Sequence, residues 1–410
     1  MASVSPAHVL TVADGAVDDR AARDLARALA AEGIPVASRQ VVDPSEAALE
    51  PALRGPLEGG GLTVVLTEPG GSGGELVPRV VARLTGARLV LNERRLALLE
   101  ASFAQRGRAM PRRLDRLGLL PKGALLLPSA PDGWDGWSLA AKNGVLVVLP
   151  LGSPHLGSMV SDFLKAPAGL EAAEALVQRV LLTTGLEAAD AEARVGAWLG
   201  KEGDVTVSCV PAEGDIHVRL LGRGATRALA EAALAPVETE VRAELGVDCY
   251  GRDDDLLEAV VGRLLLERGW TVSVAESCTG GLLGHRLTNI AGSSRYVERG
   301  VIVYSNRAKE DLLGVPEPLL RAHGAVSAAV AEAMATGVCR ISGSPCGLAV
   351  TGIAGPDGGS AEKPVGTVYI GCATPAGVET RRCRFTGDRV AIKWQASQTA
   401  LDMLRRRLVR

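Results

Sequence analysis

The stretch Val274-Ala275-Glu276-Ser277-Cys278-Thr279-Gly280-Gly281 joins an apolar run to a polar turn, which an apolar helical run then follows. This order predicts a buried strand that stops at Ser277 and a helix that begins after the glycine pair. A hydroxyl then lies at the mouth of a strand-to-helix turn. Backbone N–H groups at the helix start could hold an anion or a developing oxyanion there. Residues 347–359 supply a second polar turn after an apolar strand. Two such turns predict a site at the carboxyl ends of the strands of one sheet.

The composition is that of an ordinary soluble globular protein, with 47% hydrophobic and 22% charged residues. A length of 410 residues predicts two or three domains. The formal net charge of -2 argues against a domain that binds nucleic acid through a strong basic field. No apolar run reaches the ~18 residues that span a bilayer, and the N-terminus lacks the pattern of a signal peptide. We therefore expect a cytoplasmic protein with no membrane or nucleic-acid partner.

The cysteines and histidines do not indicate a disulfide framework or a metal site. The 7 Cys are an odd number without a C-x-x-C pair, which is typical of reduced thiols. The 5 His stand far apart and show no zinc spacing. We expect no metal in the site that the polar turns form.

The pattern of apolar runs predicts an α/β fold in three domains, residues 1–168, 169–250 and 251–410. In the first domain, strand-like and helix-like segments alternate, which predicts a parallel sheet. A linker is expected at Lys165–Gly169. The strands expected in this domain are Val9–Val12, Leu62–Leu66 and Val145–Leu149, and the helices are Asp19–Glu32 and Leu76–Leu84.

The second domain reads as a small α+β module, and the third has the most regular alternation. In the third, Asp254 or Asp255 is expected to cap a helix that runs through Arg268. The elements expected in the second domain are helices Glu171–Thr183, Ala189–Trp198 and Arg223–Leu245, with strands Val205–Val210 and Ile216–Leu221. Those expected in the third are strands Thr271–Ala275, Gly300–Tyr304, Gly347–Val350 and Gly366–Ala373, with helices Gly281–Thr288, Ser327–Arg340 and one from Arg389.

Four segments of the third domain carry polar residues where strands end. A serine such as Ser277 needs a base to take its proton, and no His lies in these segments. Lys309 is the best candidate, because the dipole of a helix that begins near Ser305 or Asn306 would lower its pKa. Tyr304 could relay a proton or donate to an oxyanion. The four segments are Ser277–Gly281, Tyr304–Lys309, Thr351–Asp357 and Thr386–Arg389.

Each of these residues also has a plain structural reading. Ser before a Gly pair is often only a turn residue, and Lys in a first helical turn is usually solvated. Cys278 is a rival nucleophile, since a thiol near a helix N-terminus is readily activated. A small buried apolar side chain is the commoner role of such a cysteine.

At these residues the chain resembles the CinA family, in particular its C-terminal nicotinamide-nucleotide amidase domain. Order and spacing agree over about 150 residues. The matching strings are Ala275–Gly281, Ile290–Ser294, Glu298–Gly300, Tyr304–Asn306, His323–Ser327, Gly352–Gly359, Glu362–Val368 and Gly387–Arg389.

The resemblance implies hydrolysis of the carboxamide of nicotinamide mononucleotide (NMN) to nicotinic acid mononucleotide and ammonia, without a cofactor. It assigns the catalytic roles to Ser277, Tyr304 and Lys309, as position alone suggests. Backbone N–H groups, the hydroxyls of Thr279 or Ser294, and Arg389 are the candidates for binding the phosphate. The full set of candidate substrate-binding residues is Thr279, Gly280, Gly281, Ser294, Asn306, Thr351, Gly352, Ala354, Gly355 and Arg389.

The rest of the chain resembles the other parts of CinA proteins. Residues 170–250 are similar to a KH-like domain, but no G-x-x-G loop is evident, so RNA binding is not inferred. The first 165 residues resemble a molybdopterin-binding-like domain that hydrolyses ADP-ribose with a metal ion in some members. Its polar turns depart from the family here, at Val12–Ala16, Thr67–Glu75 and Pro150–Pro154.

Loss of adjacent carboxylates from those turns removes the obvious ligands of a hard cation. We therefore expect the pyrophosphatase activity to be lost and a divalent metal there to be doubtful. The competing hypotheses are a non-catalytic competence or damage-response scaffold and a working N-terminal pyrophosphatase. A homodimer is the expected assembly.

Overall fold

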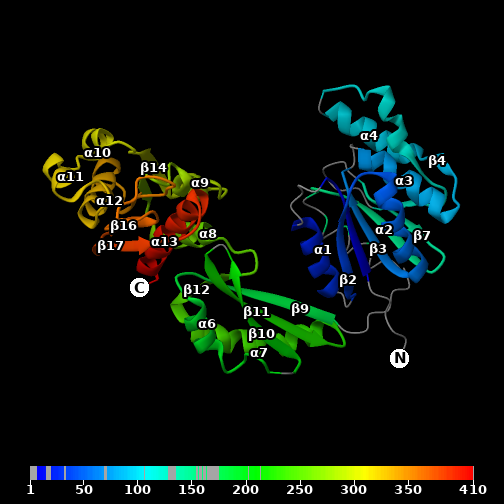
Figure 1. Cartoon of the computed structure of the whole chain (residues 1–410), viewed down its shortest axis with the longest axis horizontal. Helices are drawn as coiled ribbons and strands as arrows, with labels where there is room; N and C mark the ends of the chain where they lie inside the picture. Colours follow the sequence, from blue (N-terminus) through cyan, green and yellow to red (C-terminus); the bar gives the residue numbers. More distant parts are fainter. Residues whose placement is uncertain are drawn as a thin grey trace. The chain divides into compact units, whose positions relative to one another are not determined.

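The computed structural model describes residues 7–14, 20–31, 34–68, 72–105, 107–127, 135–153, 156, 159, 163, 175–201, 203–212 and 214–409. By its internal contacts the chain separates into two compact units, residues 1–178 with 221–235, and residues 179–220 with 236–410. The architecture is α/β with several sheets, as the sequence predicts (Figure 1). The expected linker at residues 165–169 lies outside the described residues, and the division at 168 and 250 stays a prediction.

The N-terminal part contains a 6-stranded sheet in the order β2-β1-β3-β8-β7-β6. The first four strands are parallel, and β7 and β6 are antiparallel additions. One core packs α1 against the sheet, and a second packs α2 and α3. The strands are β1 (Ala7–Val12), β2 (Val36–Val42), β3 (Gly61–Thr67), β6 (Leu125–Leu126), β7 (Trp137–Ala140) and β8 (Gly144–Pro150).

The helices of this part are α1 (Arg20–Ala31), α2 (Glu46–Gly59), α3 (Ser72–Thr85) and α4 (Glu93–Gln105), with a 3-10 helix η1 (Arg112–Gly118). A separate 2-stranded sheet pairs β4 (Leu89–Leu91) with β5 (Leu119–Pro121). The expected parallel sheet and its strands are confirmed. The two expected helices are also confirmed over their described residues.

The middle segment forms a 4-stranded sheet in the order β10-β11-β9-β12. The expected helix at Glu171–Thr183 is wrong over its described residues, because Ala175–Thr183 forms strand β9, which pairs with β12. Its β-branched Val177, Val180 and Thr183 suit a strand, and pairing outweighs its weak helical periodicity. The elements are β9 (Ala175–Thr183), α6 (Ala188–Val195), β10 (Val205–Ala212), β11 (Asp215–Gly224), α7 (Arg227–Leu245), η2 (Gly246–Asp248) and β12 (Cys249–Arg252).

The C-terminal part is a 5-stranded sheet in the order β14-β13-β15-β16-β17. Strand β13 is parallel to both of its neighbours, β14 and β15, whereas β15, β16 and β17 run antiparallel in succession. The strands are β13 (Val272–Glu276), β14 (Val297–Ile302), β15 (Cys346–Gly352), β16 (Thr367–Thr374) and β17 (Gly377–Arg384).

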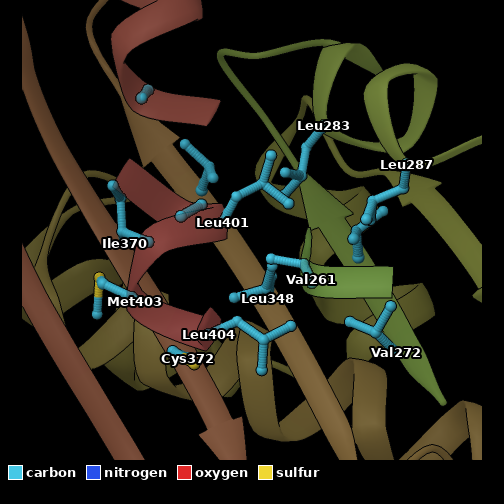
Figure 2. Packing of buried hydrophobic residues seen from close by; sticks show 14 of the residues in the cluster. Val261, Val272, Leu283, Leu287, Leu348, Ile370, Cys372, Leu401, Met403 and Leu404 are labelled. Carbon is cyan, nitrogen blue, oxygen red and sulfur yellow. The ribbon is translucent and has the colours of Figure 1, made fainter. Parts of the chain in front are cut away.

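Helices cover both faces of this sheet, so it is the middle of three layers. One core joins α8, α9 and α13 to one face, and another joins α10, α11 and α12 to the other. Figure 2 shows part of the first core, with side chains from Val261, Leu283, Leu287, Leu401 and Leu404 gathered over Val272 and Leu348. The helices are α8 (Leu257–Arg268), α9 (Leu282–Thr288), η3 (Ser293–Arg295), α10 (Asn306–Leu313), α11 (Glu317–His323), α12 (Ala328–Ser342) and α13 (Arg389–Leu408).

Two local expectations for the C-terminal part are wrong. Helix α8 begins after Leu256 without a side-chain cap, because the carboxylate of Asp255 accepts a hydrogen bond from the N–H of Arg252 instead. The strand expected at Gly300–Tyr304 begins and ends earlier, so that Tyr304 lies beyond it.

All seven cysteines are free thiols. Within the described part of the chain, no helix has the length and apolar character that crossing a bilayer requires.

A buried arginine ties helix α9 to the rest of its layer. Arg286 contacts Glu258 of α8 at 2.8 Å and Gln398 of α13 at 2.7 Å, and its guanidinium stacks on the ring of Trp394. The amide of Gln398 in turn donates to the carboxylate of Asp215 in β11, at 3.0 Å. A continuous polar path therefore joins the middle segment to the helix that follows Ser277.

Candidate active site

Ser277 lies at the carboxyl end of β13, which is flanked on both sides by parallel strands. Its N–H donates to the carbonyl of Val350 in β15, at 2.9 Å. The side chain is 8% exposed. The expected placement of this hydroxyl at a strand-to-helix turn is confirmed.

The side chain of Lys309 approaches Ser277 from helix α10. It is the fourth residue of α10, whose first turn is capped by the hydroxyl of Ser305. Its Nζ lies 3.3 Å from Ser277 Oγ, 2.7 Å from the carbonyl oxygen of Val303 and 3.4 Å from that of Tyr304. The side chain is among the largest that are fully buried, with 1% exposed.

Burial lowers the pKa of Lys309 below its ordinary value. The expected direction is right, but the main cause is desolvation of the ammonium rather than the dipole of α10. No carboxylate of the described residues forms an ion pair with this lysine. A neutral amine has two hydrogens for the two carbonyls and one lone pair for the serine hydroxyl. The three contacts therefore suit an amine that accepts the proton of Ser277.

The expectation of free N–H groups at the start of α9 is wrong, because the neighbouring carboxylate of Glu276 accepts hydrogen bonds from them. Its side chain is 1% exposed and accepts three backbone hydrogen bonds from the turn and first helical residues. The donors are the N–H groups of Gly281 at 3.0 Å, Leu283 at 3.1 Å and Gly284 at 2.8 Å. Positive φ angles at Gly280 and Gly281 let the chain fold back over the carboxylate. These N–H groups at the start of α9 are thus already bound by a side chain of the protein.

Cys278 does not have the environment of a reactive thiol. It is 6% exposed, and burial raises its pKa to about 12. A thiol with that pKa stays protonated at neutral pH, and only the thiolate is a good nucleophile. The local chemistry therefore favours Ser277 over Cys278.

Tyr304 and Arg389 lie at the outer edge of the site, and both are exposed. The Arg389 guanidinium donates to the carbonyl of Gly355 at 2.7 Å and to the hydroxyl of Tyr304 at 3.4 Å. Arg389 is the first residue of α13, after the N-cap Asp388. These two contacts bring together three of the four predicted segments, namely those that contain Tyr304, Gly355 and Arg389.

A cleft of about 270 Å³ joins the four predicted segments. Its volume is close to the lower end of the range of about 300–1,000 Å³ that small-molecule sites occupy. The predicted residues that line it include Thr351, whose hydroxyl donates to the carbonyl of Ala325 at 2.8 Å. The lining is Ser277, Cys278, Tyr304, Lys309, Ala325, Val326, Thr351, Gly352, Ile353, Ala354, Gly355, Asp357, Gly358 and Arg389.

Five of the predicted binding residues lie outside this lining. They are Thr279, Gly280, Gly281, Ser294 and Asn306. Ala325 and Val326 do line the cleft, although the sequence pattern indicated no role for either of them. Their string, His323–Ser327, matches the family and was the available signal. Among the described residues, no group of His, Cys, Asp or Glu could hold a metal ion.

Comparison with known proteins places the whole chain in one family. Models of the CinA C-terminal domain and of the damage-inducible protein CinA KH domain match residues 254–408 and 178–251. A "CinA-like protein" of Geobacter sulfurreducens is 41% identical over 96% of this chain and 95% of its own length. The chain belongs to the CinA family.

Two further proteins are similar to all or part of this chain. A "CinA-like protein" of Geobacter metallireducens is 39% identical over 96% of this chain and 95% of its own length. A crystal structure of the competence/damage inducible protein CihA from Agrobacterium tumefaciens is 44% identical. It covers 38% of this chain and 94% of that one, with a TM-score of 0.37.

Proposed function

We propose that this CinA protein hydrolyses the carboxamide of NMN to nicotinic acid mononucleotide and ammonia, without a cofactor. The observation that carries the proposal is the Ser277–Lys309 pair, with 3.3 Å between Oγ and Nζ in a small cleft. A hydroxyl beside a buried amine of lowered pKa is an activated nucleophile with its base. That chemistry suits acyl transfer from an amide.

The reaction would proceed through an acyl-enzyme. The neutral Lys309 amine takes the proton of Ser277 as Oγ attacks the carboxamide carbon. The lysine ammonium then returns that proton to the departing nitrogen, which leaves as ammonia. Water attacks the resulting ester, Lys309 takes its proton and passes it to Ser277 Oγ, and the acid is released. We assign to Tyr304, which lines the cleft, the donation to the oxyanion or the relay of a proton.

The charges of the cleft also match this substrate. NMN carries a cationic pyridinium ring and an anionic phosphate. The lining holds one carboxylate, Asp357, and one guanidinium, Arg389, and these do not form an ion pair with each other. We assign Asp357 to the ring side and Arg389 to the phosphate side.

Ammonia release from NMN by the purified full-length protein tests the proposal, with nicotinic acid mononucleotide measured in parallel. We expect equal amounts of the two products and no activity from Ser277→Ala. If the wild type releases no more ammonia than Ser277→Ala, the protein is not an NMN amidase. A non-catalytic scaffold would then be the better hypothesis.

A further inference from the structure

We infer that Lys393 forms, together with Arg389, the subsite that binds the phosphate of the substrate. The inference rests on the proposed function for the identity of the phosphate ester. It adds a residue that lies outside the motifs of the sequence and that does not itself line the cleft.

The two cations lie on one side of α13. Residues four apart on a helix are neighbours on its surface, with roughly 5–6 Å between their Cβ atoms. Arg389 points into the cleft and contacts Gly355 and Tyr304. Lys393, one turn later, places its Nζ 3.7 Å from the position that a Cβ would take on Gly280. Its ammonium therefore lies over the turn that follows Ser277.

The ammonium of Lys393 is not paired with an opposite charge. Among the described residues, none forms an ion pair or a side-chain hydrogen bond with it. The carboxylate nearest in sequence, Asp388, accepts instead from the N–H of Ala391 at 2.8 Å. Asp357, the carboxylate of the cleft lining, forms no ion pair with either cation. A half-buried ammonium beside a nucleophile's turn is well suited to an incoming anion.

The alternative place for a phosphate, the start of α9, is closed. Glu276 already accepts the N–H groups of Gly281, Leu283 and Gly284. A phosphate brought to those donors would have to displace a buried carboxylate and would be repelled by its charge. Arg389 in the cleft lining and Lys393 over the turn at Gly280 then remain as cations that could hold the phosphate.

The test compares NMN with nicotinamide riboside, which has the same carboxamide and no phosphate. We expect Lys393→Met to lower kcat/KM for NMN by a factor on the order of 10 to 100, mainly through KM. Its kcat/KM for the riboside should stay that of the wild type. Lys363→Met is the matched control, because the Lys363 ammonium lies 3.7 Å from a Cβ position on Gly324, next to the cleft. It should leave both substrates unaffected.

A binding measurement separates this inference from the proposed function. Calorimetry with NMN compares Ser277→Ala with the double variant Ser277→Ala/Lys393→Met. Weaker binding by the double variant supports the subsite even if the wild type proves to have no turnover. The inference is overturned if Lys393→Met turns over and binds NMN normally, or if NMN does not bind at all. It is also overturned if Lys363→Met lowers kcat/KM for NMN as much as Lys393→Met does. The same holds if Lys393→Met lowers kcat/KM equally for NMN and the riboside.

Discussion

Glu276 and Ser277 are consecutive residues whose side chains serve opposite faces of the same sheet. The Glu276 carboxylate holds the start of α9, and the Ser277 hydroxyl faces Lys309 of α10. Alternation along a strand produces this division. Ser277 is thus held in place by the contacts of the residue that precedes it.

Glu276→Gln should weaken this fixation. An amide has one acceptor oxygen, and its NH₂ group would face N–H donors, so at least one of three buried hydrogen bonds is lost. We expect the free energy of unfolding to fall by about 1–3 kcal/mol and kcat to fall with it. Urea unfolding measures the first and ammonia release the second. Glu332→Gln, at an exposed position of α12, is the control. Equal stability of the two variants would remove Glu276 from this role.

Ser277→Ala should abolish amide hydrolysis, whereas Cys278→Ala should keep most of it. Removing a nucleophile costs several powers of ten in kcat, because its partners cannot replace it. The thiol stays protonated at neutral pH, since burial raises its pKa to about 12. Steady-state kinetics of both variants decide the matter. An inactive Cys278→Ala beside an active Ser277→Ala would reverse the assignment.

Lys309→Met should abolish the proposed amide hydrolysis with little change in affinity for NMN. In the wild type, kcat/KM should rise with pH through a group whose pKa lies below the ~10.4 of a free lysine, because the neutral amine is the base. Arg307→Met, an exposed change in the same helix, should leave the pH profile intact. Retained activity in Lys309→Met would pass the base role to Tyr304 or to water.

The same substitution has a predictable effect on stability. Burial lowers the pKa of Lys309 in the folded state, so the unfolded chain binds more protons between that pKa and about 10.4. The free energy of unfolding of the wild type therefore rises with pH across that window. Lys309→Met lacks this titration, so its free energy of unfolding should rise less with pH across that window than that of the wild type. Equal pH dependence of urea unfolding in the two proteins would contradict this account.

The N-terminal domain should not hydrolyse ADP-ribose. Cations at such a site must be held by several oxygen ligands, and Glu75 instead pairs with Arg116 at 3.8 Å. Asp14 is exposed at the end of β1. The full-length protein with Mg²⁺, Mn²⁺ or Co²⁺ should release no AMP above background. Metal-dependent AMP release that is lost in Asp14→Ala or Glu75→Ala would restore the pyrophosphatase hypothesis.

The sequence predicted the ends of β13, β15 and β16 to within two residues, because each is an apolar run that stops at a polar turn. That sufficed to bring Ser277, Lys309 and Thr351 to one cleft. Strand β14 ends earlier than expected, and β17 was not predicted. The role of Glu276 was not predictable, since its partners are backbone groups that converge only after two glycines adopt positive φ. The role inferred for Lys393 was not predicted, because this residue stands one helical turn beyond the recognised segment. Strand β9 was misread because its pairing partners lie far away in the sequence.

The path from Arg286 through Gln398 to Asp215 limits how this chain can be recombined with other CinA proteins. A chimaera that joined residues 254–408 to a foreign middle segment would keep the Gln398 amide but could lose the carboxylate opposite it. Gln398 is only 7% exposed, so an unmatched amide there is costly. Gln398 also contacts Arg286 of α9, so the loss would lie next to the helix that follows Ser277. Exchanging the two segments together preserves the match.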